Sequence, residues 1–243
     1  MSNKIKFTAK DPHAWGITQR PFPASEAVPQ WWKDMTPYIK DHRSPDGSKL
    51  VITNGTANAS AKKCIPMLDS LTSGYIIPLW CDVQVRSASD SEYLPVVEWK
   101  ISKRTVFELH NASSKEVQHP PGYTNIALKF INNWLVKTPP GYSIMCTEPF
   151  GYRDLAFKAI PSIIDSDTSS LCPLFPVWIK DGFEGIVEKG TPMVQITPFK
   201  RENWQSEFDY LEHGEYQIIE DRGFETTIVN HYIKNHWRKK KYK

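Results

Sequence analysis

Proline constrains this chain more than any other residue, because nineteen prolines are spread along its 243 residues. A proline lacks the backbone N–H donor and breaks a helix interior, whereas turns and edge strands tolerate it. The sequence therefore excludes a bundle of long helices. Its length allows one large β domain with a sizeable core. A hydrophobic content of 40% and a charged content of 23% are typical of a folded globular protein.

Short segments rich in β-branched and aromatic residues predict strands along most of the chain. They are residues 75–85, 96–101, 105–110, 127–131, 134–138, 142–147, 157–164 and 175–179. Gly, Pro, Asn and Asp separate them, a spacing typical of a sandwich, jelly roll or barrel. We therefore expect a mainly β fold, with a single jelly-roll or barrel-like domain over residues 64–225.

Residues 183–201 carry the clearest local pattern. Two apolar, alternating segments, 183–187 and 193–199, flank a turn that contains Gly190. Glycine readily adopts the positive φ that such a turn often needs. The pattern predicts a β-hairpin.

Residues 1–63 are irregular and rich in proline and large aromatic residues. Each aromatic side chain buries on the order of 150–250 Å² when it packs. We expect an extended aromatic arm that packs on the β domain, with one short helix that begins near Pro29. Trp31 and Trp32, in that helix, are candidates for docking on a neighbouring subunit. Trp99, Trp134, Trp178 and Trp204 lie in or beside predicted strands and are expected in the core, with a stacking platform for a sugar or base as the alternative.

The C-terminal segment, residues 226–243, differs in pattern and in charge. Apolar residues between 226 and 237 follow one stripe of an amphipathic helix. Six of the 30 basic residues lie in the last ten positions, which contain no acid, so the rest of the chain holds 24 basic against 27 acidic residues. Trp237, Arg238, Lys239 and Lys240 are candidates for contact with an assembly partner, an acidic surface or nucleic acid; a solvated charged end is the alternative.

Asp165 and Asp167 are the main candidates for chemistry. In a strand both side chains point to one face, where two like charges raise one pKa or recruit a cation. In a turn, the same aspartates would instead cap backbone N–H groups. Arg153 and Arg201 are candidates for binding an anion.

Other catalytic patterns are missing from the sequence. No histidine pair has the i, i+4 spacing of a helical metal site, and no phosphate-binding glycine loop or G-x-S-x-G motif occurs. His213-Gly214-Glu215 matches half of a facial triad, a pattern that arises easily by chance. The four cysteines form no C-x-x-C pair, which favours reduced thiols. We expect no metal and no cofactor.

Four elements between residues 139 and 201 resemble the dUTPase and dCTP deaminase jelly-roll superfamily. They are the Pro-Gly-Tyr turn at 140–142, Ile-Asp-Ser-Asp at 164–167, the glycine after Phe-Glu at 183–185, and Lys-Gly-x-x-x-x-Gln at 189–195. The resemblance implies a nucleotide pocket with Asp165 or Asp167 near the nucleotide, and it implies that Gln195 lies on a core strand. The ligand-binding candidates of the chain are Tyr142, Arg153, Gln195 and Arg201. Thr168 and Ser169 stand where that superfamily carries a tyrosine, and its glycine-rich tail has only Arg222-Gly223-Phe224 as a counterpart.

A second resemblance extends over more of the chain. Its motifs are Pro-x-Trp-Trp-Lys-Asp-Met at 29–35, Thr-Ser-Gly-Tyr-Ile-Ile-Pro-Leu at 72–79, Ile-Asp-Ser-Asp at 164–167, Gly-Thr-Pro-x-x-Gln-x-x-Pro-Phe-Lys-Arg at 190–201, and Trp-Arg-Lys-Lys at 237–240. The chain is similar in these motifs to an uncharacterised family found in tailed phages, especially marine ones, and in some bacteria. This resemblance implies a phage context and one continuous domain, and it carries no activity.

Two hypotheses about function follow. In the first, the chain is a phage-type β protein with a non-catalytic binding or structural role, working as a homo-oligomer or with phage assembly proteins. In the second, it is a jelly-roll enzyme or small-molecule binder, related to nucleotides, with Asp165 and Asp167 lining a pocket. No apolar run approaches the roughly 18 residues of a membrane span, and no signal peptide is recognisable, so we expect the host cytoplasm or the virion as its location.

Overall fold

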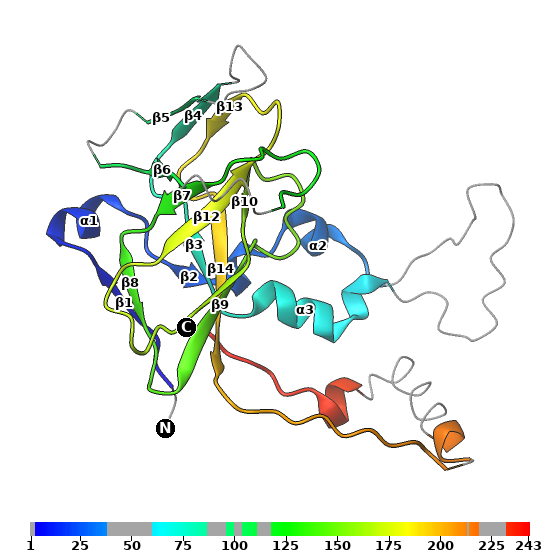
Figure 1. Cartoon of the computed structure of the whole chain (residues 1–243). Helices are drawn as coiled ribbons and strands as arrows, with labels where there is room; N and C mark the ends of the chain where they lie inside the picture. Colours follow the sequence, from blue (N-terminus) through cyan, green and yellow to red (C-terminus); the bar gives the residue numbers. More distant parts are fainter. Residues whose placement is uncertain are drawn as a thin grey trace, which may run out of the picture. The chain divides into compact units, whose positions relative to one another are not determined.

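The computed structural model describes residues 3–37, 60–86, 96–99, 104–110, 118–212, 214–218 and 232–243. It is mainly β, as the strand patterns predict (Figure 1). The chain divides into two compact units, residues 1–27, 73–201 and 242–243 in the first, and 28–72 and 202–241 in the second. Both units combine segments that are distant in sequence. Their limits differ from those of the expected segments 1–63, 64–225 and 226–243, whose membership of one structural domain stays a prediction.

The described residues of the first unit form four antiparallel sheets. The five-stranded sheet has the order β11(Ser162–Ile164), β9(Tyr142–Thr147), β14(Pro192–Lys200), β3(Tyr75–Pro78), β2(Phe22–Pro23). The four-stranded sheet has the order β10(Phe157–Ala159), β12(Leu174–Ile179), β7(Leu128–Ile131), β6(Phe107–Leu109). The three-stranded sheet has the order β13(Gly185–Val187), β4(Val83–Arg86), β5(Val96–Glu98), and β1(Lys6–Ala9) pairs with β8(Trp134–Lys137). No barrel closes among the strands that the structure describes.

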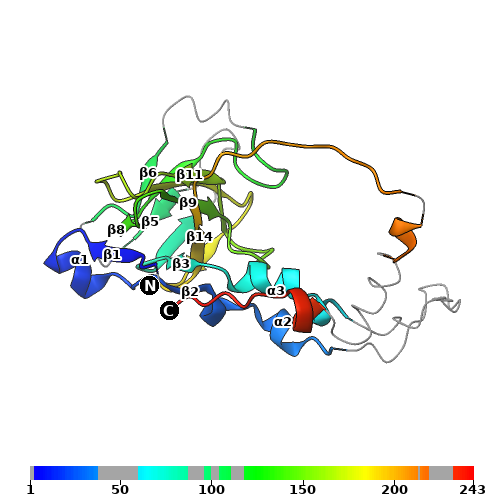
Figure 2. The same ribbon diagram turned by 90° about the horizontal axis from the view of Figure 1, so that it is seen from below.

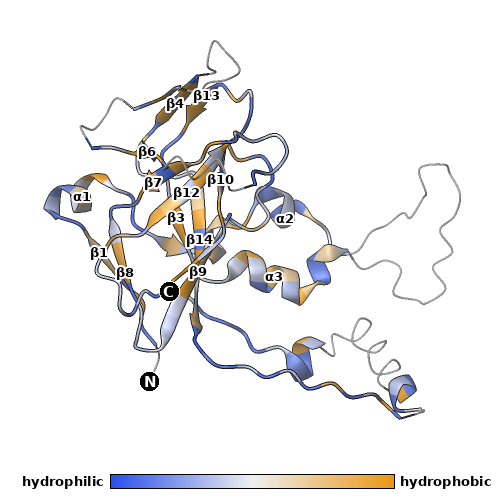
Figure 3. Ribbon diagram, in the orientation of Figure 1, coloured by the Kyte–Doolittle hydropathy of each residue, from blue (hydrophilic) through white to orange (hydrophobic). Residues whose placement is uncertain are grey.

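The core of this unit joins the two larger sheets. Ile77, Ile144 and Ile196 of the five-stranded sheet belong to the same buried cluster as Phe130 and Phe175 of the four-stranded sheet. Hydrophobic residues accordingly dominate β3, β12 and β14 (Figure 3). At least one face of each of these strands packs inward, and β3 is buried on both faces, which accounts for the apolar patterns that predict the strands.

The predicted hairpin at residues 183–201 is wrong. β13 and β14 do not pair with each other: β13 pairs with β4, and β14 pairs with β3 and β9. Pro78 pairs with Pro192, and Val83, five residues later, pairs with Val187, five residues earlier, so these two pairs share one antiparallel register. The register shifts by one residue between Pro192 and Val194, where the rest of β14 pairs with β3. Between them, the Leu79 N–H donates to the Thr191 carbonyl and the Gly190 N–H donates to the Leu79 carbonyl. Gly190, at a φ of 94°, therefore lies where a two-stranded ribbon bends from one sheet into another.

The predicted strand at residues 157–164 is divided between two sheets. β10 ends at Ala159 and pairs with β12, whereas β11 begins at Ser162 and pairs with β9. Pro161 lies between them and has no N–H with which to continue a ladder. The chain thus changes sheets at this proline and delivers residues 165–167 to the edge of the five-stranded sheet.

The N-terminal residues form ordered elements. Asp11 caps α1(Pro12–Ile17): its side chain accepts a hydrogen bond from the Ala14 N–H at 2.8 Å and pairs with Arg104 at 2.6 Å. Both interactions hold the pKa of the Asp11 carboxyl below its usual value. A short 3₁₀ helix, Ala24–Ala27, ends the N-terminal part of this unit.

The second unit contains the short helix expected near Pro29, which is α2(Gln30–Asp34), and α3(Ile65–Thr72). A 3₁₀ turn, Ala61–Lys63, precedes α3. Of the expected C-terminal helix, residues 226–231 lie outside the described residues, and Tyr232–His236 form one π-helical turn. The described part of the chain contains no helix long and apolar enough to cross a membrane.

Candidate functional site

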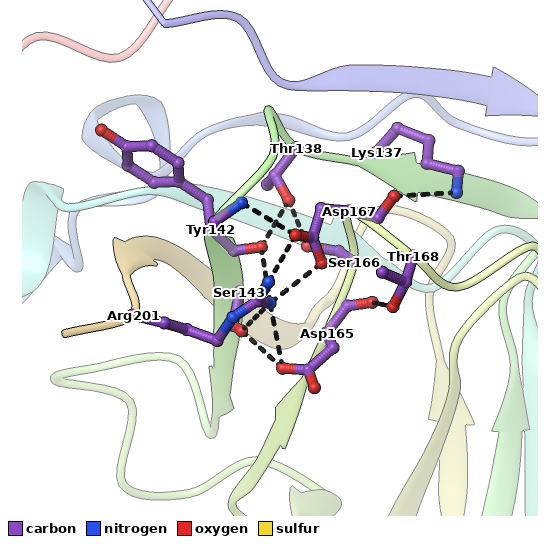
Figure 4. Close-up of polar contacts among 10 residues, drawn as sticks. Lys137, Thr138, Tyr142, Ser143, Asp165, Ser166, Asp167, Thr168 and Arg201 are labelled. Carbon is purple, nitrogen blue, oxygen red and sulfur yellow. Dashed lines mark hydrogen bonds and ion pairs between the residues drawn. The ribbon is translucent and has the colours of Figure 1, made fainter. Parts of the chain in front are cut away.

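The candidate aspartates lie where β11 ends. β9 pairs with β11 on one side and with β14 on the other, so residues after the ends of both neighbours meet beside the start of β9. Asp165 and Asp167 come from the first neighbour, and Arg201 comes from the second (Figure 4). The sheet therefore brings together groups that lie 34 positions apart in sequence.

Arg201 joins the two aspartates. Its Nη1 donates to Asp167 Oδ1 at 2.9 Å and to Asp165 Oδ1 at 3.2 Å, and its Nη2 donates to Asp167 Oδ2. A guanidinium bound to a carboxylate through two nitrogens is a strong, geometrically specific pair. Arg201 Nη1 also donates to the Ser143 hydroxyl at 2.9 Å.

Backbone and hydroxyl donors complete the cluster. The Gly141 N–H donates to Asp167 Oδ2 at 2.9 Å, and the Ser143 hydroxyl donates to Asp165 Oδ1 at 2.6 Å. Ser166, between the aspartates, shares a hydrogen bond with Thr138 at 2.7 Å. These contacts connect the segment after β11 to the turn before β9. Asp167 accepts a hydrogen bond from a backbone N–H of that turn, as expected for an aspartate that caps a turn.

The two carboxylates differ in exposure. The Asp167 side chain is 7% exposed, whereas that of Asp165 is 63% exposed. The hydrogen bonds from Arg201 hold the pKa of Asp167 well below its usual range, and Asp167 in turn raises the pKa of Arg201. A general acid at neutral pH needs a raised carboxyl pKa. Asp167 therefore has the electrostatics of a structural ion pair, and Asp165 presents the accessible carboxylate of the cluster.

The ligand-binding candidates do not converge on one place. Tyr142 and Arg201 lie at the start of β9, where the Tyr142 hydroxyl accepts a hydrogen bond from Asn3 at 2.7 Å. Gln195 pairs with Thr147 at the other end of β9. Thr147 lies five residues after Tyr142, which is about 17 Å along a strand. Arg153 is exposed on the segment that follows the same end.

The Gln195 amide is occupied by the backbone. Its Oε1 accepts from the Phe150 N–H at 2.9 Å, and its Nε2 donates to the Ser73 carbonyl at 2.7 Å. The side chain is almost fully buried. These bonds hold β14, the loop after β9 and the residue before Gly74 together.

Histidine and cysteine side chains are the other candidates for metal and thiol chemistry. Among the residues that the structure describes, no three His, Cys, Asp or Glu residues are grouped as metal ligands; His213 and His231 lie outside them. Cys64 is exposed and no cysteine is in a disulfide. Burial raises the pKa of Cys81 to about 11 and that of Cys146 to about 12, so both are poor thiolate nucleophiles.

The partner-binding candidates have different environments. Trp32 is 3% exposed and packs edge-on against Trp31, which is partly exposed, at 5.8 Å between ring centroids. The Trp237 indole donates to the Asp69 carboxylate at 3.0 Å, and Lys240 pairs with the same carboxylate. Arg238 and Lys239 are exposed. Asp69 thus anchors the C-terminal residues Trp237 and Lys240 to α3.

The expected burial of Trp204 is wrong. Its position identifies an exposed segment that the sequence patterns did not predict. Trp134 and Trp178 are buried and Trp99 packs against the core, but Trp204 is 85% exposed. Phe208 and Tyr210 in the same segment are also exposed. The recurrence of aromatic residues at positions 204, 208 and 210, two or four residues apart and separated by polar residues, was the available signal for an amphipathic extended segment.

Comparison of the chain with protein-family models, with curated proteins and with solved structures finds no match.

Proposed function

We propose that this chain is a non-catalytic assembly protein of a tailed phage, which works through protein contacts as a homo-oligomer or with other phage proteins. The observation that carries this proposal is the segment after β14, in which Trp204, Phe208 and Tyr210 are all exposed. Exposed apolar groups gathered on one segment are typical of protein-interaction surfaces. The motifs at residues 29–35 and 190–201, which resemble those of a phage family, support the context.

The aspartate cluster agrees with such a role. Asp167, Arg201 and the Gly141 N–H satisfy one another, which leaves Asp165 as a single accessible carboxylate. A two-carboxylate mechanism needs a second group with a different pKa and free access to the substrate. The cluster is better suited to holding the edge of the sheet.

The finer architecture belongs to the same proposal. We propose that the two larger sheets are the halves of a jelly-roll-type body, which their shared core supports. Residues 226–237 would complete a C-terminal amphipathic helix in front of the basic tail. The protein would act in the host cytoplasm or in the virion.

A second function, nucleotide binding, is favoured by one observation. Asp165 is exposed beside Arg201 and the Ser143 hydroxyl, so an anion-binding group and a hydrogen-bond acceptor share one accessible place. The local resemblance of residues 139–201 to the dUTPase and dCTP deaminase superfamily supports this alternative.

Sedimentation velocity and a thermal-shift screen separate the two functions. The assembly role predicts a defined oligomer and no change in melting temperature with nucleotides or divalent metals. A nucleotide that raises the melting temperature of the native protein but not of Asp165→Asn would refute it. Asp154→Asn, at an exposed aspartate paired with Lys180 at 3.5 Å, is the matched control.

A further inference from the structure

The acidic arm, residues 202–212, has the alternating sequence pattern of a β-strand. It runs as an extended ribbon after β14 (Figure 1, Figure 2), and every residue in it is exposed. Successive side chains of an extended chain point to opposite sides. Trp204, Ser206, Phe208 and Tyr210 therefore share one side, and the intervening residues, Gln205, Glu207 and Asp209, share the other. No residue of this arm belongs to a β ladder among the described strands.

The aromatic side of the acidic arm is large enough to form an interface. Phe208 is 92% exposed and Tyr210 is 79% exposed, besides Trp204. Three aromatic side chains bury roughly 450–750 Å² when they pack. That area lies in the upper half of, or above, the range of about 300–600 Å² for the largest apolar patch of an ordinary monomer.

The charge of the arm indicates the chemistry of its partner. Residues 202–212 contain four acids and no Lys or Arg. Two arms placed against each other would repel, because like charges opposite one another destabilise a strand pair. The partner surface must therefore be basic, and it must accept an extended segment.

The basic segment, Arg238–Lys241, has these properties. It carries four positive charges in four residues, all exposed, and it belongs to no helix or strand. Asp69 holds Lys240, so Lys239 and Lys241 share the opposite side of the extended chain. Lys239 and Lys241 are two residues apart, and so are Glu207 and Asp209. The positive charges on one extended segment therefore have the same spacing as the negative charges on an antiparallel partner.

We propose that the acidic arm of one copy pairs with the basic segment of a second copy of this chain. The inference rests on the proposed assembly role and names its partner. No ion pair among the described residues joins Glu207 or Asp209 to Lys239 or Lys241 within one copy. Because each copy carries both segments, the exchange is reciprocal and closes as a two-fold dimer. The arm's aromatic side then lies on the same face as Arg238 and the Lys240 stem, where cation–π contacts add to burial.

Charge reversal tests this pairing by sedimentation velocity of the full chain. The arm variant is Glu207→Lys with Asp209→Lys, and the tail variant is Lys239→Glu with Lys241→Glu. Each variant alone is expected to raise the dimer dissociation constant at least about 10-fold, because close interfacial charge pairs are replaced by like charges. An equimolar mixture of the two variants restores the dimer, since each reversed arm then meets a reversed tail.

A third variant and a control complete the experiment. Phe208→Ala is expected to weaken the dimer at least about 30-fold, the effect of removing an aromatic hot spot. Glu26→Lys with Asp181→Lys makes the same change of charge at exposed positions outside the arm and leaves the dimer intact. Unchanged far-UV circular dichroism of each variant confirms that it is folded.

Three outcomes would overturn the pairing. If the native chain oligomerises but the arm and tail variants do so equally well, the arm exchange is wrong while the assembly role stands. If the mixture of variants does not restore the dimer, the two segments do not contact each other. If the native chain is a monomer and a nucleotide stabilises it, both the pairing and the assembly role are refuted; tail-dependent binding of a short oligonucleotide by such a monomer would assign the basic segment to nucleic acid instead.

Discussion

Replacing Gly74 by alanine tests the closest backbone approach in the five-stranded sheet. Gly74 precedes β3 and adopts a φ of 73°. A Cβ atom at this position would lie 1.9 Å from the carbonyl oxygen of Ile196 and 3.0 Å from the Cα of Thr197, both in β14. The Gly74 carbonyl also accepts a hydrogen bond from the Ala24 N–H at 3.0 Å. The residue therefore cannot move without disturbing two neighbouring segments.

The expected loss of stability has two parts. A residue other than glycine in the left-handed region costs about 1–2 kcal/mol. Displacing packed neighbours to make room for extra atoms costs typically about 1–3 kcal/mol. Together these predict a fall of about 2–5 kcal/mol in the free energy of unfolding, a large part of the roughly 5–15 kcal/mol of an ordinary domain.

Gly122 provides a matched control for this prediction. Its φ is 78°, close to that of Gly74, but no atom lies within 4 Å of the place where a Cβ would stand. Gly122→Ala therefore carries the backbone cost alone, about 1–2 kcal/mol. Urea unfolding followed by tryptophan fluorescence measures both variants. If Gly74→Ala loses no more stability than Gly122→Ala, the close approach of β14 is not a constraint and the reasoning fails.

Two further predictions concern the ion pairs. The pKa of Asp167 is lower in the folded than in the unfolded chain, so this carboxylate stabilises the fold above its usual pKa of 3.8 and loses that effect as the pH falls through the folded value. Asp167→Asn should thus lower the melting temperature at pH 7, and the gap from the native protein should narrow below about pH 4. Asp69→Asn should weaken the hold on Trp237 and Lys240 and let trypsin cut the basic segment roughly 10-fold faster, because hydrogen bonds to a charged group are replaced by weaker ones.

Each of these changes has a control within the chain. Asp154→Asn alters an exposed ion pair and should change stability by less than about 0.5 kcal/mol at either pH. An equal effect of Asp154→Asn and Asp167→Asn would show that burial of Asp167 is unimportant. Asp34→Asn alters an exposed side chain of α2, and it should leave the rate of trypsin cleavage in the tail unchanged. Equal acceleration by both variants would contradict an anchor at Asp69.

The residues of the candidate site could be predicted from the sequence, but their environment could not. Asp165 and Asp167 stand out in the sequence as a pair, and a turn that caps backbone donors was one of two interpretations. The choice between a pocket and a turn depended on Arg201 and Gly141, which contact Asp167 only because β9 lies between β11 and β14. Gln195 is a similar case, because its amide oxygen accepts a hydrogen bond from the Phe150 N–H, 45 residues earlier in the chain.

Most strand positions between residues 75 and 200 could be predicted from the sequence, because the alternation of apolar and polar residues is a local property with a period of two. β1 and β2 lie in the N-terminal segment, where the sequence pattern predicts no strand. Which strands pair was decided only by the tertiary structure, because pairing depends on contacts between distant segments. Residues 183–201 illustrate the difference: both strands and the turn at Gly190 are present, yet β13 joins β4 while β14 joins β3 and β9. Trp204 is a second example: its aromatic ring predicts burial, but the fold leaves the side chain exposed to solvent. Composition specified what this chain must bury, and the packing of the sheets decided what remained exposed for a partner.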